Sequence, residues 1–229
     1  MSDGHQAPSA QSTSVPVRAS SRPPAVRRFL RNRAAVVGLI LVVLLVLLAV
    51  FAPLLAPYAP DAQNLRARLR GPSAEHWFGT DEFGRDILSR VLYGARISLF
   101  TGLVPVVSGL LVGTTIGLVA GYYRGRIDDV LMRVMDVLLA FPSLLLALAV
   151  VGALGPGLVN AVIAVAIVAV PGYARLARSV VIATREEEFV QAARALGARD
   201  PRLLVRHVLP TTLGPLSVQA TLGIGFAIL

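Results

Sequence analysis

The sequence lacks two residue types and is poor in a third kind of side chain. It has no cysteine, so disulfides, thiolate metal sites and cysteine nucleophiles are excluded, and nothing indicates a redox compartment. It has no lysine, because all 22 basic residues are arginine. A P-loop for ATP hydrolysis requires a lysine, so a P-loop ATPase is excluded for this chain. Aromatic residues make up only 6%. The three histidines, His5, His76 and His207, lie too far apart to predict a metal site.

Apolar residues are abundant and gather into long blocks. They make up 55% of the 229 residues, against 15% charged residues, which is typical of an all-α polytopic membrane protein. The formal net charge of +9 would also suit a nucleic-acid-binding protein, but such apolar blocks would not. We therefore expect the lipid bilayer, and no nucleic acid, as a partner.

The uncharged runs predict five membrane spans. Residues 34–52, 97–123 and 211–229 are each long enough to cross a hydrocarbon core of about 30 Å. Residues 137–174 are too long for one span and are interrupted by Gly155, Pro156 and Gly157, so they predict two. A cleaved signal peptide is the alternative to the first span, but the leader is too long, which favours a retained anchor.

The intervening segments complete the predicted organisation. Residues 1–26 are rich in Ser, Pro, Gln and Ala and predict a disordered cytoplasmic tail, followed by the N-terminal segment and first span in 27–52. Residues 53–96 predict an external loop with a short helix near Ile87, and residues 97–229 the main membrane domain. With the N-terminus inside, sixteen arginines are cytoplasmic and six external, as the positive-inside rule favours.

A stripe of glycines marks the second predicted span. Four of them recur at every fourth position, on one face of a helix: Gly109, Gly113, Gly117 and Gly121. Small residues at this spacing let a second helix approach closely, so we expect helix packing more than a role in gating.

The charged stretch between the last two spans predicts a helical hairpin. Phe189, Ala192, Ala193 and Leu196 share one helix face, and Gly197 is suited to the left-handed residue that ends a helix. Asp200 and Pro201 are typical of the N-cap and first turn of a second helix, which Pro210 is expected to stop at the membrane boundary. Small residues on the first apolar face favour a face that fits into a partner's groove.

The same residues resemble a known family. The loop residues listed next resemble the EAA loop of ABC importer permeases, although Gln191 stands where the family has Glu: Gln191, Ala192, Ala193, Gly197, Asp200, Leu209 and Pro210. Glu187 or Glu188 could substitute for that Glu. The segments FGTDEFGRDILSR, LMRVMDVLLAFPSLLLA and PGYARLAR, in this order, resemble the dipeptide, oligopeptide and nickel permease subfamily.

The resemblance implies the fold and the function. It implies an ABC type-1 transmembrane domain with six spans, so the chain, ending at Leu229 in the fifth, is expected to be C-terminally incomplete. It implies a non-enzymatic permease subunit in a bacterial inner membrane, importing peptides or nickel. Residues 186–210 would be its cytoplasmic coupling loop. The implied partners are a second homologous permease, an external substrate-binding protein and two ABC ATPase subunits, which carry the ATP and Mg²⁺, with no cofactor on this chain.

The alternative is an ATP-independent secondary transporter or channel. An ion-coupled transporter normally places ionisable residues at mid-membrane depth, and the central portions of these spans contain none. An intramembrane hydrolase would need a Ser/His pair or paired aspartates inside the spans, and no span contains a histidine or an acidic residue at mid-depth. The pattern therefore favours coupling to a separate ATPase.

Two sets of charged residues remain to be assigned a role. Asp81, Glu82 and Asp86 could suggest catalysis, but no nucleophile accompanies them, and we expect a capped loop leading into a helix. Asp129, Arg133 and Asp136 fall on one helix face, where ion pairing is the favoured role and a second cytoplasmic contact with the ATPase the alternative.

Overall fold

The computed structural model describes residues 29–228. The predicted disordered tail, residues 1–26, lies outside the described residues. The chain divides into two compact units, residues 1–44 and 45–229, and each is considered by itself. The described part of the first unit holds most of helix α2 (Arg33–Val50), whose side chains are apolar on every side. A helix that is apolar all round is typical of a membrane span.

All the long helices of the described residues suit a membrane. Four are long and apolar enough to span one: α2, α4 (Ile87–Tyr123), α7 (Leu158–Thr184) and the helical stretch Asp200–Ile228. A pair bent by 95°, α5 (Gly125–Ala140) and α6 (Ser143–Leu154), passes the same test together. The structure thus has four or five candidate spans, in agreement with the predicted all-α membrane fold.

Helix α4 is longer than the sequence predicts. The short helix expected near Ile87 does not end before the second span but continues into it, giving one helix of 37 residues. At 1.5 Å per residue it is about 55 Å long, which exceeds the hydrocarbon core of about 30 Å. The charges of Arg90 and Arg96 limit the part of the helix that lies in lipid, but they do not end the helix itself.

The third predicted span is also different. Residues 124–132, which lie between the second and third predicted spans, belong almost entirely to α5, which begins at Gly125. The helix ends at Ala140, and its C-cap, Phe141, has an extended backbone, because the ring of Pro142 disfavours a helical conformation in the preceding residue. The uncharged run before Gly155 is therefore divided between α5 and α6 and is not one straight helix.

The glycine stripe brings α4 and α7 into close contact. A Cβ atom on Gly113 or Gly117 would lie 2.6 Å from the Val170 carbonyl oxygen or 2.3 Å from the Ala174 carbonyl oxygen, respectively. Only a residue without a side chain permits such an approach. Gly109 and Gly121 face α7 in the same way, so all four glycines serve the packing of these two helices.

Helix α10 (Leu209–Ile228) lies beside α4 and α7, and it is continuous with the segment before it. Pro210 does not stop the helix, contrary to the prediction. A π-helical turn, η2 (Leu204–Val208), precedes it, in which the Leu209 N–H donates to the Leu204 carbonyl. This wider turn joins α9 (Asp200–Leu203) to α10 and accommodates Pro210, which has no N–H to donate to a carbonyl of the preceding turn.

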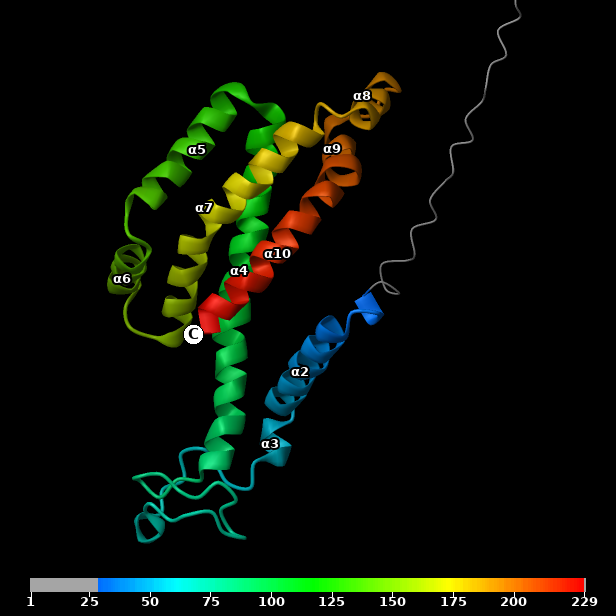
Figure 1. Cartoon of the computed structure of the whole chain (residues 1–229). Coiled ribbons are helices and arrows are strands. Elements are labelled where there is room, and N and C mark those ends of the chain that lie inside the picture. Colours follow the sequence, from blue (N-terminus) through cyan, green and yellow to red (C-terminus); the bar gives the residue numbers. More distant parts are fainter. Residues whose placement is uncertain (1–28, 229) are drawn as a thin grey trace, which may run out of the picture. The chain divides into compact units, whose positions relative to one another are not determined.

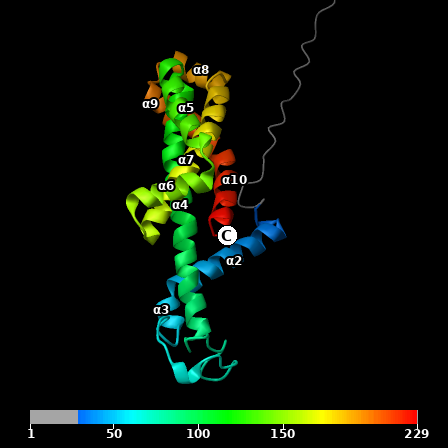
Figure 2. The ribbon, with the colours of Figure 1, turned by 90° about the vertical axis from the view of Figure 1, so that its left-hand side faces the viewer.

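The two ends of α4 carry different structures. At its N-terminal end lies the segment we call the 53–86 loop, which contains the end of α3 (Ala52–Leu55), η1 (Leu65–Ala67) and an isolated bridge between Thr80 and Asp86. At its C-terminal end lies the 186–210 hairpin, with α8 (Glu188–Ala195) and α9. Figures 1 and 2 show the loop and the hairpin at opposite ends of α4.

Candidate functional site

The 186–210 hairpin turns at Gly197. Its φ of +84° lies in the left-handed region, which glycine adopts without a steric penalty. Helix α8 ends just before this residue, and the second helix begins at Asp200, which occupies its first turn with Pro201. The N-cap is Arg199 and not Asp200 as predicted. The carboxylate of Asp200 is therefore free to bond elsewhere.

Asp200 bonds to the end of α4. The hydroxyl of Tyr122 donates to Asp200 Oδ1 at 2.6 Å and accepts a hydrogen bond from the Arg194 guanidinium at 3.3 Å. Arg185, at the C-terminal end of α7, donates to the backbone carbonyl of the same tyrosine. Tyr122 thus joins α4, the end of α7 and both helices of the hairpin.

An apolar core supports this network. Val181, Val190, Leu203 and Val208 are fully buried and pack with the ring of Tyr122, which is itself only 4% exposed. Burial of side chains of this size contributes about 1.5–3 kcal/mol each. The hairpin is consequently fixed to the ends of α4 and α7 and cannot move independently of them without exposing this core.

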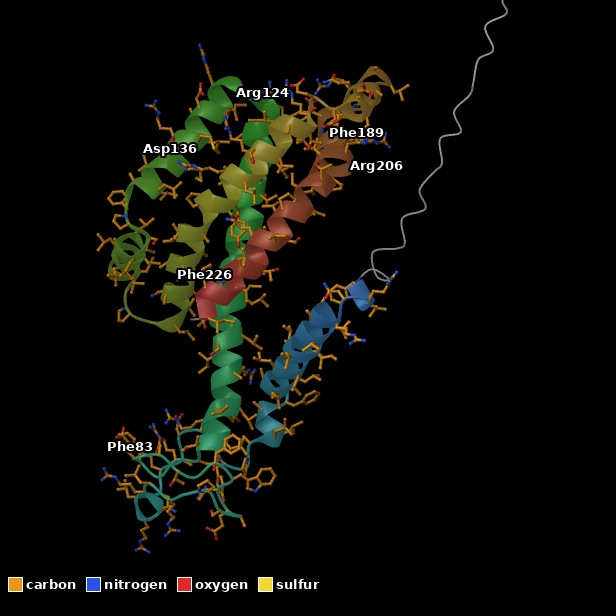
Figure 3. The ribbon with its side chains drawn as sticks, viewed as in Figure 1. Phe83, Arg124, Asp136, Phe189, Arg206 and Phe226 are labelled. Carbon is orange, nitrogen blue, oxygen red and sulfur yellow. The ribbon has the colours of Figure 1, made fainter. Side chains whose placement is uncertain are left out.

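The opposite face of the hairpin is exposed and apolar. Leu196 is 89% exposed, Phe189 48% and Val205 65%. Ala192 is also exposed, whereas Ala193 is partly buried against the core, so the predicted apolar face is divided between the two sides. Figure 3 shows Phe189 and Arg206 at the same end of the unit as Arg124, with Phe83 at the far end. Exposed large apolar side chains on a charged segment suit contact with a partner.

Gln191 has a local partner. Its side-chain Nε2 donates to the Arg185 carbonyl at 3.1 Å, at the end of α7. A glutamate carboxylate has no proton to donate there at neutral pH, so glutamine suits this position in a way that Glu would not. Leu209 and Pro210, the last of the predicted hairpin residues, begin α10, with Pro210 exposed.

The ion pairs of α5 run between helices and not along its own face. Asp136 accepts from Arg175 of α7 at 2.6 Å, while Asp129 and Arg133 are exposed and form no ion pair within residues 29–228. The predicted pairing along α5 was wrong in this respect. Pairing across to α7 places opposite charges on two helices that already touch.

The stronger ion pair of this region, between Asp128 and Arg178, was not predicted from the sequence. Asp128, which is buried, receives two hydrogen bonds from Arg178, at 2.5 and 2.6 Å. This bidentate geometry is the most favourable for arginine and a carboxylate. A charge at the margin of a long uncharged run could have indicated Arg178, because such residues need a partner. No local pattern could have indicated Tyr122.

The acidic residues of the 53–86 loop are structural. Asp86 caps α4, accepting from the Ser89 N–H and hydroxyl, both at 2.8 Å, and its carboxylate lies 3.0 Å from Nδ1 of His76. Burial raises the pKa of Asp86, but these donors outweigh it and lower the pKa below the ordinary value. The loop therefore has the capped form predicted from the sequence.

Asp81 is held in a similar way, and Glu82 is exposed. Burial raises the pKa of Asp81, yet the N–H groups of Arg85 and Phe83 and the Arg85 side chain together lower it to about 2. A carboxylate with so low a pKa is a poor general base at neutral pH. Within residues 29–228, no three His, Asp or Glu side chains form a cluster that could hold a metal ion.

Two family models match the chain. Residues 113–229 match the model described as binding-protein-dependent transport system inner membrane component. Residues 24–72 match the model for the N-terminal transmembrane domain of oligopeptide transport permease C. The first match includes α5 to α10 and therefore the whole 186–210 hairpin.

The chain is also similar to individual bacterial proteins. A dipeptide transport system permease protein of Alkalihalophilus pseudofirmus is 54% identical over 90% of this chain and 67% of its own length. A glutathione transport system permease protein of Pectobacterium atrosepticum is 46% identical over 89% and 68%. A probable D,D-dipeptide transport system permease protein of Escherichia coli is 47% identical over 85% and 65%. The chain spans about two thirds of the length of these relatives.

Proposed function

This chain belongs to the family of binding-protein-dependent transport system inner membrane components, and from that premise we propose that it carries small peptides. It is a permease subunit of an ABC importer, and separate ATPase subunits hydrolyse ATP in such systems. The names of the relatives support peptide cargo: two transport dipeptides, and the third transports glutathione, which is itself a small peptide. These names favour peptides over nickel.

The 186–210 hairpin is the segment on which the ATPase acts. The observation that carries this assignment is its two-sided construction, with Leu196 exposed on one face and Val190 and Leu203 fully buried on the other. The exposed face would contact the ATPase, and the buried face would pass its movement to α4 and α7 through Tyr122. Asp129 and Arg133, exposed on α5, offer a second contact.

The surrounding assembly follows from this assignment. A second, homologous permease, two ATPase subunits and an external binding protein complete the importer, as expected for a binding-protein-dependent system. The N-terminus and the hairpin face the cytoplasm, and the 53–86 loop faces outward. Family membership favours this ATP-driven mechanism over the alternative of an ATP-independent transporter or channel.

The complete transporter in proteoliposomes tests the proposal. Uptake of a radiolabelled dipeptide should require ATP, the binding protein and this chain together. Leu196→Arg should abolish uptake and weaken ATPase binding, because a central interface residue typically contributes about 2 kcal/mol or more, roughly thirtyfold in affinity.

Leu65→Arg provides the matched control. Leu65 is also an exposed leucine, at 70%, but it lies in the 53–86 loop, at the other end of α4. We expect it to retain both uptake and ATPase binding. Dipeptide uptake without ATP would contradict the importer, and equal loss in the two variants would contradict the assignment of the hairpin.

A further inference from the structure

A cavity of about 400 Å³ lies between α7 and α10, with the end of α5 beside it. Its walls are mainly apolar, and the residues that matter most for its chemistry are Gly172, Tyr173, Gln219, Gly223 and Phe226. Figure 3 shows Phe226 near the end of α10, beside α7. The size falls within the range of about 300–1,000 Å³ that is typical of small-molecule sites. No ionisable carboxylate, guanidinium or imidazole lines it among the described residues.

Two polar groups from different helices meet at this cavity. Tyr173 has a ring that is only 3% exposed, and Gln219 is an exposed amide at the middle of α10. The hydroxyls of Thr212, Ser217 and Thr221 on α10 bond to carbonyls of their own helix. Within residues 29–228, neither the amide of Gln219 nor the hydroxyl of Tyr173 forms a hydrogen bond, although both side chains line the cavity.

Glycines make room for these polar groups. A Cβ atom on Gly172 would lie 3.3 Å from the amide nitrogen of Gln219, and one on Gly223 would lie 2.9 Å from the Tyr173 hydroxyl. Larger residues at the two positions would displace the polar ends. The two glycines and the two polar side chains therefore form one arrangement across α7 and α10.

The depth of Gln219 restricts what can face it. The residue lies ten positions, about 15 Å, from the start of α10 at Leu209, which corresponds to the centre of a hydrocarbon core of about 30 Å. An amide facing lipid at this depth would leave donors and an acceptor without partners, which is costly. A ligand or water that supplies both a donor and an acceptor removes that cost.

We propose that this cavity is a binding site for the backbone of the transported peptide. The inference rests on the proposed peptide cargo. A peptide unit has one N–H and one C=O, which complement the amide of Gln219 and the hydroxyl of Tyr173. The apolar walls, including Phe226, would accept varied side chains. Because no charged group lines the cavity, the site would recognise the backbone and not a particular charge.

Single-cysteine labelling tests the site, since the chain has no cysteine of its own. Leu222 lines the same cavity and is 62% exposed, so Leu222→Cys leaves both polar groups in place. In the complete transporter this variant should react with a water-soluble, membrane-impermeant thiosulfonate, which is detected as an increase in the mass of this chain. Saturating alanyl-alanine should slow that reaction at least fivefold. Val218→Cys is the matched control: Val218 is equally exposed, at 62%, and lies four positions before Leu222 on α10 but does not line the cavity, so it should not react.

Transport by the control variant separates this proposal from the proposed function. If Val218→Cys takes up alanyl-alanine but Leu222→Cys does not react, this face of α10 lies against lipid or another subunit, and the site is contradicted. Reaction that alanyl-alanine does not slow contradicts it as well. If the wild-type transporter takes up no dipeptide at all, the assignment of peptide cargo has failed instead.

Discussion

At the scale of the residue, Tyr122 joins α4 to the hairpin both by packing and by hydrogen bonds. It packs among Val181, Val190 and Leu203, and its hydroxyl reaches Asp200, 78 positions later in the sequence. Phe shares the shape of this side chain but lacks the hydroxyl. The substitution therefore separates the hydrogen bond from the packing, which substitution by Ala would not.

We expect Tyr122→Phe to uncouple ATP hydrolysis from transport. A hydrogen bond to a charged group contributes about 1.5–3 kcal/mol, so its loss should loosen the hairpin against α4 without unfolding the packed ring. The ATPase subunits should still co-purify with the variant, because the exposed face of the hairpin is unchanged. The ATP hydrolysed per dipeptide imported should rise severalfold in proteoliposomes.

The neighbouring tyrosine is the control for this prediction. Tyr123 is 47% exposed, and its hydroxyl forms no hydrogen bond within residues 29–228, so Tyr123→Phe should leave the ratio of ATP to dipeptide unchanged. An unchanged ratio in Tyr122→Phe would show that packing alone transmits the movement.

At the scale of the element, prolines show what the sequence could predict and what it could not. The uncharged runs predicted the membrane helices, because an uncharged run of this length suits the hydrocarbon core of a membrane. The breaks were harder to predict. Helix α5 ends before Pro142. The helical stretch of α9 and α10, by contrast, continues through Pro210, where Leu209 remains helical despite preceding a proline. Burial of Leu203 and Val208 against Tyr122 holds that second region in place, and these contacts come from distant parts of the chain.

The hairpin illustrates the same division. The positive φ of Gly197 follows from a local signal, as does the start of a helix near Asp200. The bond from Asp200 to Tyr122 and the pair of Asp128 with Arg178 depend on which helices become neighbours. Residue spacing along α5 predicted that Arg133 would pair with an acidic residue of the same helix. Asp136 instead pairs with Arg175 of α7, which spacing along one helix could not predict.

The contact of α4 with α7 leads to a prediction at this scale. A Cβ on Gly117 would lie 2.3 Å from the Ala174 carbonyl oxygen and 2.6 Å from the Cβ of Ala177, so Gly117→Ala must push the two helices apart. Such overpacking costs about 1–3 kcal/mol. The midpoint of thermal unfolding of the purified chain in detergent should fall accordingly.

Gly94→Ala is the comparison in the same helix. A Cβ there meets nothing within 4 Å, and replacing glycine by alanine inside a helix stabilises it by about 0.5–1 kcal/mol. Its unfolding midpoint should stay the same or rise. Equal midpoints for the two variants would mean that α4 and α7 can separate at Gly117 without cost.

At the scale of the whole molecule, the arginines predict an orientation. Ten of them lie in residues 124–136 and 175–206, which include the hairpin end of α4, and six lie in residues 53–96, at the opposite end. Positively charged segments are retained on the cytoplasmic side of a membrane. We therefore expect the hairpin to be cytoplasmic and the 53–86 loop to be external.

Two single-cysteine variants measure this orientation in the chain, which is free of cysteine. Glu82 and Leu196 are both exposed, so Glu82→Cys and Leu196→Cys should leave the fold intact. An impermeant thiol reagent should label Glu82→Cys in intact spheroplasts and Leu196→Cys only in inverted membrane vesicles. The reverse pattern would place the hairpin outside, where no ATPase could reach it, because ATP is supplied from the cytoplasm. The reverse orientation would therefore also contradict the assignment of the hairpin as the contact with the ATPase.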